Sequence, residues 1–331
     1  MIYGKITLED WRTACVEGEE PESSFESYNL RLFFFGTLYN RDTLQATPDD
    51  TNAKLAADAF LSDPAYGFSR LDGSFTIVYY SENECGVVRD HHGTHYPVYC
   101  HIDGNFATSW QFLEDQLEEN FEPNLVSLST FLQRGILKKN NFALFDVHSL
   151  GAGEKFYMLT ELGYLMPVWA SVKLETQANV HSMFDSLKER NPSLYEKVAD
   201  DIYCLKRDSV FEHEPKVATE RNPDVETYSR RYGELHAQAI RRRIGHSRRV
   251  GILLSGGYDS GSNLAALRSI YDGQIDSYSV GFKGDAWTEL PMARLMSETF
   301  GTRHHEYEID GTETSALPDI VRFLGEPFME G

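Results

Sequence analysis

The pattern of apolar and polar residues changes along this chain of 331 residues. Up to about residue 170, short apolar or aromatic runs alternate with turn residues, which is typical of strands and hairpins. The clearest runs are residues 30–35, 75–80, 85–89 and 98–101, with turns predicted at Gly36, Asp72-Gly73, Asn83 and Asp103-Gly104. Helices are predicted over 51–61 and 127–134. Packed sheets with helices outside fit this pattern.

From residue 223 onward the spacing of apolar residues changes, and segments with helical spacing alternate with segments typical of strands. The predicted order is helix 224–243, strand 250–254, helix 262–271, strand 275–282, helix 289–300 and strand 304–309. Such alternation predicts a doubly wound parallel sheet, which binds ligands at the carboxyl ends of its strands. We therefore expect a domain at 1–170, a helical insertion or linker at 171–222 and a second domain at 223–331. A packed linker is favoured over a partner-binding surface for the middle segment.

The most informative stretch is Ser255-Gly256-Gly257-Tyr258-Asp259-Ser260, which follows the apolar run at 250–254. A strand, a glycine turn and a helix in this order gather backbone N–H groups and a positive helix end, an arrangement suited to phosphate. Glycines allow close approach of the backbone. Ser255 and Ser260 add hydroxyl donors. The simpler alternative is a strand-to-helix turn that binds no ligand.

Asp259 is an acceptor among these donors. A carboxylate facing a polyphosphate would repel it unless a divalent cation lies between them, so Asp259 is the candidate Mg²⁺ ligand. The spacing differs from that of the Walker loop, because no Gly-Lys-Ser/Thr follows the glycines.

The Ser-Gly-Gly-Xaa-Asp-Ser motif resembles the pyrophosphate loop of the ATP pyrophosphatases, and its flanking residues resemble the asparagine synthetase family. The resemblance implies ATP and Mg²⁺ as cofactors. It also implies that the segment Ser279–Phe282 packs on adenine and that Leu254 and Val280 abut the base. The implied nucleotide-binding residues are Leu254, Ser255, Gly256, Gly257, Asp259, Ser260, Val280 and Gly281.

Short motifs in the first 170 residues resemble, in order, the glutaminase domain of the same family, an α+β sandwich of the N-terminal-nucleophile (Ntn) hydrolase type. They are Leu71–Phe75, Arg89-Asp90 with Gly93 and Pro97–Tyr99, Phe106–Ser109 and Leu150–Gly153. The resemblance thus implies an α/β protein of two domains, an Ntn-like sandwich and a nucleotide-binding parallel sheet.

Two departures predict that the glutaminase chemistry is lost. The family nucleophile is a cysteine that becomes the first residue when the methionine is removed, so that its own α-amine can act as the base for the thiol. Position 2 of this chain is Ile2 instead. An oxyanion-stabilising Asn of the family is replaced by Phe35, which removes an amide donor. We expect no catalytic residue in this domain. In this it resembles β-lactam synthetases and lasso-peptide cyclases.

Near the end of the sequence, Glu326-Pro327 resembles the Asp-Glu-Pro of the family, with Gly325 in place of the Asp. Later family segments, which supply a second Mg²⁺ carboxylate and the acceptor pocket, do not follow. We therefore expect a truncated synthetase domain, completed by a second chain or by further C-terminal residues.

Charge and cysteine content restrict the partners. With 31 basic and 51 acidic residues the net charge is −20, which disfavours nucleic acid and anionic membranes. The cysteines (Cys15, Cys85, Cys100 and Cys204) are widely spaced and lack metal-ligand spacing. Three histidines (His91, His92 and His95) lie in a predicted turn, where surface or hydrogen-bonded roles are favoured over metal or base roles. No signal peptide or membrane span is apparent, so a cytoplasmic location is expected.

The resemblance implies an ATP-dependent amide-bond-forming ligase that adenylates a small-molecule or peptide carboxylate for attack by an amine or by ammonia. The alternative is a non-catalytic ATP-binding subunit of a split synthetase. A third hypothesis, an active glutamine amidotransferase, would need a processed N-terminal cysteine. The sequence identifies neither the carboxylate nor the amine.

Overall fold

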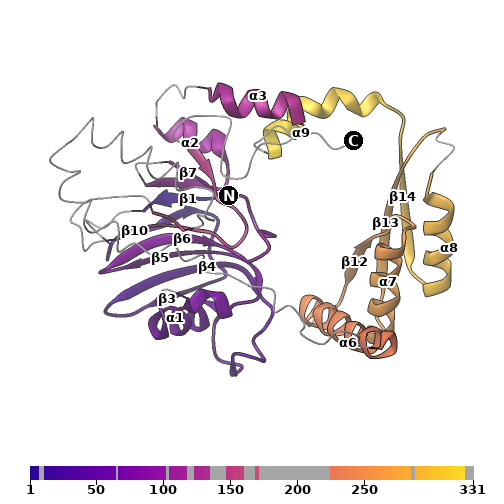
Figure 1. Ribbon diagram of the computed structural model, residues 1–331, viewed down its shortest axis with the longest axis horizontal. Coiled ribbons are helices and arrows are strands. Elements are labelled where there is room, and N and C mark those ends of the chain that lie inside the picture. The colour runs from indigo at the N-terminus through magenta and orange to yellow at the C-terminus, as the bar shows by residue number, and fades with distance from the viewer. Residues whose placement is uncertain are drawn as a thin grey trace. The chain divides into compact units, whose positions relative to one another are not determined.

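The computed structural model describes residues 1–6, 11–64, 66–101, 104–117, 123–134, 147–159, 168–170, 224–245, 247–284 and 288–324. The chain forms two compact units, Met1–Glu214 with Leu324–Gly331, and Pro215–Phe323 (Figure 1). The predicted insertion at 171–222, Cys204 and the segment 325–327 lie outside the described residues.

The N-terminal unit contains two antiparallel sheets. The six-stranded sheet has the order β11 (Val168–Ala170), β10 (Lys155–Leu159), β6 (Glu84–Arg89), β5 (Gly73–Ser81), β4 (Leu30–Leu38) and β3 (Ser23–Glu26). The five-stranded sheet has the order β2 (Val16–Gly18), β1 (Ile2–Lys5), β8 (Asn105–Ala107), β7 (Tyr99–His101) and β9 (Val147–Ser149). The strands predicted around residues 30, 75, 85 and 98 are thereby confirmed.

Alternating residues of these strands build three layers of core. Along β4, Leu32 and Phe34 pack with helix α1 (Asn52–Ser62), whereas Phe35 faces the five-stranded sheet and packs with Ile2. On the other side of the five-stranded sheet, Tyr99 packs with Leu113 of helix α2 (Trp110–Leu117). The unit is therefore a sandwich of two sheets with helices on its outer faces, as the apolar pattern predicts.

The predicted helices are present, and one predicted turn is wrong. Thr51 caps α1 by accepting a hydrogen bond from the Lys54 amide, and helix α3 (Leu125–Arg134) covers the second predicted helix. A short 3-10 helix, η1, spans Gly67–Arg70. Gly36 does not end its strand but lies inside β4 with φ +110°. A Cβ at that position would lie 2.2 Å from the Ser74 carbonyl oxygen, so glycine allows close strand pairing.

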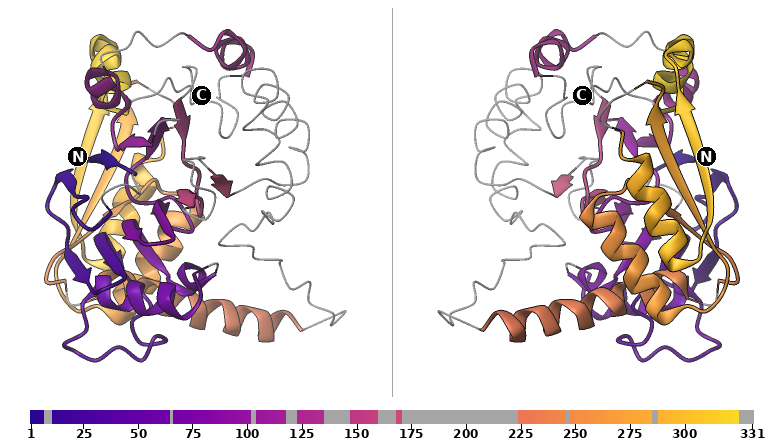
Figure 2. Two further views of the ribbon diagram at one scale, coloured as in Figure 1. Left: turned by 90° about the vertical axis from the view of Figure 1, so that its left-hand side faces the viewer. Right: turned by 90° about the vertical axis from the view of Figure 1, so that its right-hand side faces the viewer.

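The C-terminal unit is built on three parallel strands, β12 (Val250–Leu253), β13 (Ile275–Phe282) and β14 (Arg303–Ile309), in that order. Its helices are α6 (Val225–Ile244), α7 (Tyr258–Ile270) and α8 (Leu290–Phe300), followed by η3 (Thr312–Ala316) and α9 (Leu317–Leu324). Figures 1 and 2 show α7 and α8 side by side on one face of the strands. Apolar residues of α6, α7, α8, β12 and β13 form one core cluster there.

The expectation of a doubly wound sheet is only partly met. The parallel strands are confirmed, but in the described part of the unit the core cluster lies on one face of the sheet. On the other face, Leu253 is 79% exposed and Phe282 63% exposed. The sequence pattern did not reveal this, because β13 carries apolar residues (Tyr278, Val280 and Phe282) on its exposed face and small polar residues (Ser277 and Ser279) on its buried face.

Candidate functional site

The glycine-rich loop joins the carboxyl end of β12 to the start of α7 in the C-terminal unit. The helix begins at Tyr258, four residues before the predicted start, so Asp259 and Ser260 belong to its first turn. Gly261 does not delay the helix. It is buried against Met296 of α8, and a Cβ there would lie 2.9 Å from the Met296 Cε atom.

Two serine hydroxyl groups close the loop on itself. The Ser255 amide donates to Ser260 Oγ at 3.2 Å, and the two Oγ atoms are 3.0 Å apart. The Gly257 amide in turn donates to Ser255 Oγ at 3.2 Å. The structure thus brings together the five central predicted residues, Ser255, Gly256, Gly257, Asp259 and Ser260.

The first turn of α7 presents free donors at this loop. The amide N–H groups of Tyr258, Asp259 and Ser260 have no acceptor among the described residues, and the first intrahelical bond runs from Gly261 to the Gly257 carbonyl at 3.0 Å. Unpaired N–H groups at a helix start carry partial positive charge. Together with two glycines that lack side chains, these groups can receive phosphate oxygens.

Asp259 is exposed, and its carboxylate makes no hydrogen bond or ion pair within the described residues. It can therefore serve as one ligand of a divalent cation. In the part of the chain that the structure describes, no group of three His, Cys, Asp or Glu side chains could hold a metal. A Mg²⁺ ion here would take its other ligands from phosphate oxygens and water, as Mg²⁺ commonly does.

The start of α8 forms a wall of the loop that the sequence did not predict. Gly256 adopts φ +95°, and a Cβ there would lie 2.7 Å from the Glu289 carbonyl oxygen and 3.1 Å from Met292 Cβ. Gly281 of β13 lies against Leu290 in the same way, with a hypothetical Cβ 2.6 Å from Leu290 Cδ1. Both glycines are therefore needed to bring the loop, β13 and α8 together.

Leu254 and Val280 do not face one another. Leu254 is 1% exposed and packs in the core cluster with Leu264 and Ala293, on the helix-covered face of the sheet. Val280 is 61% exposed and lies on the open face. The main chain of Leu254 is tied to β13 at the residues before Val280, since the Leu254 amide donates to the Tyr278 carbonyl at 2.8 Å and Ser279 Oγ donates to the Leu254 carbonyl. The main chain of Leu254 thus remains at the loop, while its side chain belongs to the core.

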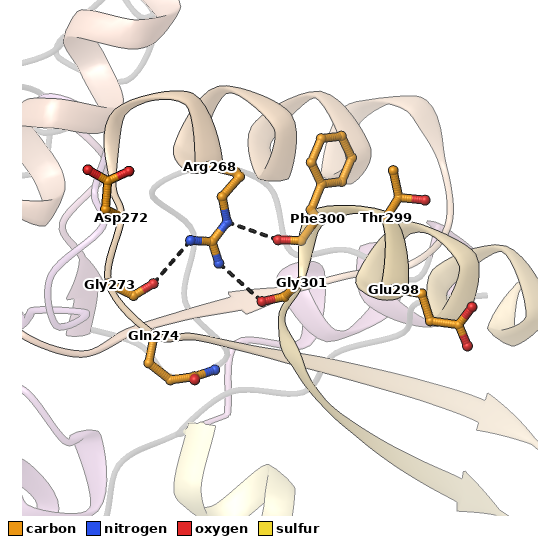
Figure 3. Close-up of a pocket in the computed structure, with 8 residues that line it drawn as sticks. All are labelled: Arg268, Asp272, Gly273, Gln274, Glu298, Thr299, Phe300 and Gly301. Carbon is orange, nitrogen blue, oxygen red and sulfur yellow. Dashed lines mark hydrogen bonds between the residues drawn. The ribbon is translucent and has the colours of Figure 1, made fainter.

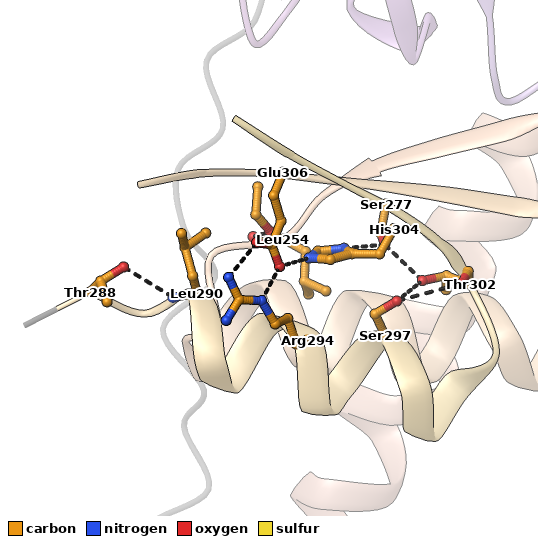
Figure 4. Close-up of polar contacts among 10 residues, drawn as sticks. Leu254, Ser277, Thr288, Leu290, Arg294, Ser297, Thr302, His304 and Glu306 are labelled. Atoms are coloured by element: carbon orange, nitrogen blue, oxygen red, sulfur yellow. Dashed lines mark hydrogen bonds and ion pairs between the residues drawn. The ribbon is translucent and has the colours of Figure 1, made fainter. Parts of the chain in front are cut away.

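A polar network behind the loop ties α8 to β13 and β14 (Figure 4). Ser277 Oγ lies 2.8 Å from His304 Nδ1, and His304 Nε2 lies 3.1 Å from Glu306 Oε1. Arg294 of α8 donates two hydrogen bonds of 2.6 Å to the Glu306 carboxylate. These bonds hold the pKa of Glu306 below its usual range. Ser277, a small polar residue within the apolar-bounded strand β13, is the sequence signal for this network.

A hollow of about 560 Å³ lies near the amino ends of β13 and β14, beyond the carboxyl ends of α7 and α8. Figure 3 shows the Arg268 guanidinium crossing it. Arg268 donates to the carbonyl oxygens of Phe300, Tyr271, Gly273 and Gly301 at 2.9 to 3.2 Å. Its donors are occupied in capping two helix ends, so this hollow is a structural feature rather than the candidate site.

In the N-terminal unit, the positions expected to have lost glutaminase chemistry are apolar and buried. Ile2 and Phe35 belong to one hydrophobic cluster between the sheets, and both are at most 1% exposed. The Ile2 amide donates to Thr108 Oγ1 at 3.0 Å. Of the three histidines, His95 lies 2.9 Å from Thr76 Oγ1, and burial lowers the pKa of its imidazole.

Cys15, Cys85 and Cys100 are free thiols. Burial raises the pKa of Cys85 to about 12. Within the described residues, no helix is both long and apolar enough to cross a membrane.

Residues 231–330 match the asparagine synthase family model. This match supports a relationship between this chain and the asparagine synthase family. The matched segment contains the glycine-rich loop, β13, α8 and β14, so the match falls on the elements that build the candidate site. It covers most of the C-terminal unit and none of the strands of the two-sheet sandwich.

Two similar proteins are also named as asparagine synthetases. The chain is 35% identical over 79 residues to the "Putative asparagine synthetase (glutamine-hydrolyzing)" of Mycobacterium bovis, which is 24% of this chain and 12% of that protein. It is 32% identical over 81 residues to the "Putative asparagine synthetase (glutamine-hydrolyzing) 2" of Methanocaldococcus jannaschii, which is 24% of this chain and 16% of that protein. The similarity thus spans a small part of each relative.

Among solved structures, the chain is similar to the B. subtilis glutamine phosphoribosylpyrophosphate amidotransferase complexed with ADP and GMP. The similarity covers 93% of this chain and 76% of that one, at 12% identity and a TM-score of 0.33. A TM-score of this size supports no argument about the fold of either unit.

Proposed function

We propose that the glycine-rich loop binds the phosphates of ATP with Mg²⁺, and that the protein is an ATP-dependent ligase that activates a carboxylate for amide formation. One observation carries the proposal: unpaired N–H groups, two glycines and the exposed Asp259 carboxylate converge at the start of α7, inside the segment that matches asparagine synthase. A helix start of this kind favours anionic ligands.

Each residue of the loop has a proposed role that follows from its chemistry. The amides of Tyr258, Asp259 and Ser260 would receive phosphate oxygens, and Asp259 would hold Mg²⁺. When bound, Mg²⁺ would neutralise charge on the polyphosphate. The backbone of Leu254, Val280 and Gly281 would border the nucleotide at the carboxyl edge of the sheet.

The proposed reaction has two steps. A carboxylate oxygen attacks the α-phosphorus of ATP and forms a new O–P bond, and the bond to the β-phosphate breaks with its electron pair leaving on pyrophosphate. An amine then attacks the carbonyl carbon, loses a proton and displaces AMP. Donors at the loop stabilise the pyrophosphate as its charge develops.

We further propose that the amine does not come from glutamine hydrolysed in the N-terminal unit. Ile2 and Phe35 fill the space between the sheets with apolar side chains. Neither can act as a nucleophile or donate to an oxyanion. The amine would be free ammonia, a separate molecule or a group on the substrate. We also propose that a second chain can take part in the reaction as a partner.

The first test is calorimetric titration of ATP with and without Mg²⁺, on the wild type and on Asp259→Asn. We expect Mg²⁺ to tighten ATP binding in the wild type, and Asp259→Asn to abolish this gain. Asp272→Asn is the matched control, because Asp272 is also exposed but lies beyond the far end of α7. Absence of ATP binding by the wild type would contradict the proposal.

The second test is pyrophosphate release from ATP in the presence of a panel of carboxylates and amines, with and without candidate partner chains. Release that depends on a carboxylate supports the ligase. ATP binding without release under any of these conditions would favour a non-catalytic subunit of a synthetase.

A further inference from the structure

A small pocket of about 190 Å³ lies in the N-terminal unit, between the β3–β4 hairpin and the segment that precedes β2. Its lining is unusual in chemistry, because it combines two guanidinium groups with two aromatic rings. The lining residues are Trp11, Arg12, Glu26, Ser27, Tyr28 and Arg31. Neither the asparagine synthase match nor the glycine-rich loop involves these residues.

The guanidinium group of Arg12 contacts two aromatic rings. Its Cζ atom lies 5.2 Å from the ring centre of Trp11 and 5.3 Å from that of Tyr28. Among the described residues it has no ion pair. Contact of a guanidinium with aromatic faces leaves its N–H groups, which point outward in the plane, available for an oxyanion.

Arg31 supplies the second guanidinium and is more buried, with a side chain 19% exposed. Its Nη1 atom donates to the carbonyl oxygens of Arg12 and Ala14 at 2.7 and 2.6 Å, and its Cζ atom lies 5.6 Å from the Phe33 ring centre. These contacts fix the orientation of Arg31 and join it to the backbone of Arg12. Two cations are thus positioned on one small pocket.

The acidic neighbour of this pair is weakly engaged. Glu26 Oε1 lies 4.0 Å from Arg31 Nε, beyond hydrogen-bond distance, and the Glu26 side chain is 74% exposed. An exposed ion pair of this kind contributes little to stability. A carboxylate that enters the pocket can therefore displace Glu26 at small cost and make the hydrogen bonds that Glu26 does not make.

We propose that this pocket binds the carboxylate group of a small organic anion. The planar carboxylate pairs with the N–H groups of Arg12 and Arg31, and the organic part of the ligand lies against Trp11 and Tyr28. Guanidinium and carboxylate match in planar, two-point geometry, and the small volume admits one such group. The inference is independent of nucleotide binding, since it concerns the other unit.

The test uses benzoate as the probe and protein in which the tryptophan indoles are ¹⁵N-labelled. The chain has four tryptophans, and Trp11→Phe assigns the signal of Trp11. We expect benzoate to shift this signal saturably, and benzyl alcohol, which has the same ring without the charge, to leave it unchanged. Arg12→Gln should weaken benzoate binding at least ten-fold. Arg230→Gln, at an exposed arginine of α6, should not change it.

Glu26→Gln gives a test in the opposite direction. Removal of the competing carboxylate should tighten benzoate binding, a gain that partial unfolding cannot produce. The proposal is overturned if benzoate gives no saturable shift, if Arg12→Gln binds as well as the wild type, if benzyl alcohol binds equally, or if Glu26→Gln weakens binding. Thermal unfolding of each variant checks that the fold is retained.

Discussion

Ser255 and Ser260 close the glycine-rich loop through their side chains, with the two Oγ atoms 3.0 Å apart and the Ser255 amide donating to Ser260 Oγ at 3.2 Å. Ser260 Oγ also lies 3.3 Å from the Gly257 carbonyl oxygen. One hydroxyl therefore bridges the end of β12 and the first turn of α7. The loop is shaped before any ligand arrives, so binding need not spend free energy on ordering it.

Removal of this bridge should weaken nucleotide binding more than it weakens the fold. We expect Ser260→Ala to lower the free energy of unfolding by about 1 kcal/mol, the usual value for one hydrogen bond. ATP affinity should fall roughly ten-fold, which corresponds to about 1.4 kcal/mol. Calorimetry with MgATP and urea unfolding measure the two effects. Ser262→Ala is the control, since Ser262 Oγ only donates to the Asp259 carbonyl within the helix; an equal loss of ATP affinity in that variant would contradict the argument.

The two glycines of the loop should respond differently to alanine. Gly256 has φ +95°, and a Cβ there would lie 2.7 Å from the Glu289 carbonyl oxygen, so Gly256→Ala should cost about 1–3 kcal/mol of stability. Gly257 has φ −78°, and the nearest atom to a Cβ is Ser255 Oγ at 3.4 Å. Gly257→Ala should leave stability nearly unchanged. Urea unfolding of both variants decides the matter, and similar midpoints would show that α8 does not constrain the loop.

The sequence predicted what depends on near neighbours in the chain. The apolar run before Ser255 and the glycines after it specify a strand, a turn and a helix, and the structure has all three. Thr51 likewise marks the start of α1, where its side chain accepts from the Lys54 amide. The predicted bounds of the strand at 275–282 are those of β13 in the structure.

What depends on distant contacts was missed. Gly36 reads as a turn from its neighbours, yet pairing with β5 keeps it inside β4. Leu254 and Val280 share a sheet edge, but their side chains take opposite faces because Leu254 joins the core beneath α7 and α8. The approach of Glu289 to Gly256 is equally invisible in the sequence, because it depends on the packing of α8.

A pH-dependent loss of stability should arise at Asp276. A hydrogen bond from Arg303, and to a smaller extent one from His305, lowers the pKa of this carboxyl group to about 2. Its folded-state pKa is thus below the unfolded value, so its contribution is present at neutral pH and is lost as pH falls from about 4 towards 2. We expect the thermal midpoint of the wild type to drop over this range. Asp276→Asn should be less stable at pH 7 and should show a shallower drop; Asp272→Asn should retain the wild-type slope. A wild-type slope in Asp276→Asn would contradict the assignment.

Replacement of Arg268 should lower the stability of the C-terminal unit. It donates to four carbonyl oxygens, those of Phe300, Tyr271, Gly273 and Gly301, at the ends of α7 and α8. Its removal leaves these acceptors without their charged donor. A charged hydrogen bond contributes about 1.5–3 kcal/mol, so Arg268→Ala should lower the free energy of unfolding by roughly 2–3 kcal/mol.

Two further variants separate the geometry of Arg268 from its charge. Arg268→Lys keeps the positive charge at the helix ends but has no planar fork that reaches both α7 and α8. It should recover less than half of the loss. Arg230→Ala removes an exposed arginine of α6 that pairs with Glu234 at 3.0 Å, and should cost less than about 0.5 kcal/mol. If Arg268→Lys were as stable as the wild type in urea unfolding, the positive charge at the helix ends would account for the stabilisation by Arg268, and the planar guanidinium geometry would not. MgATP binding should persist in Arg268→Lys, because Arg268 lies at the edge of the sheet opposite the glycine-rich loop.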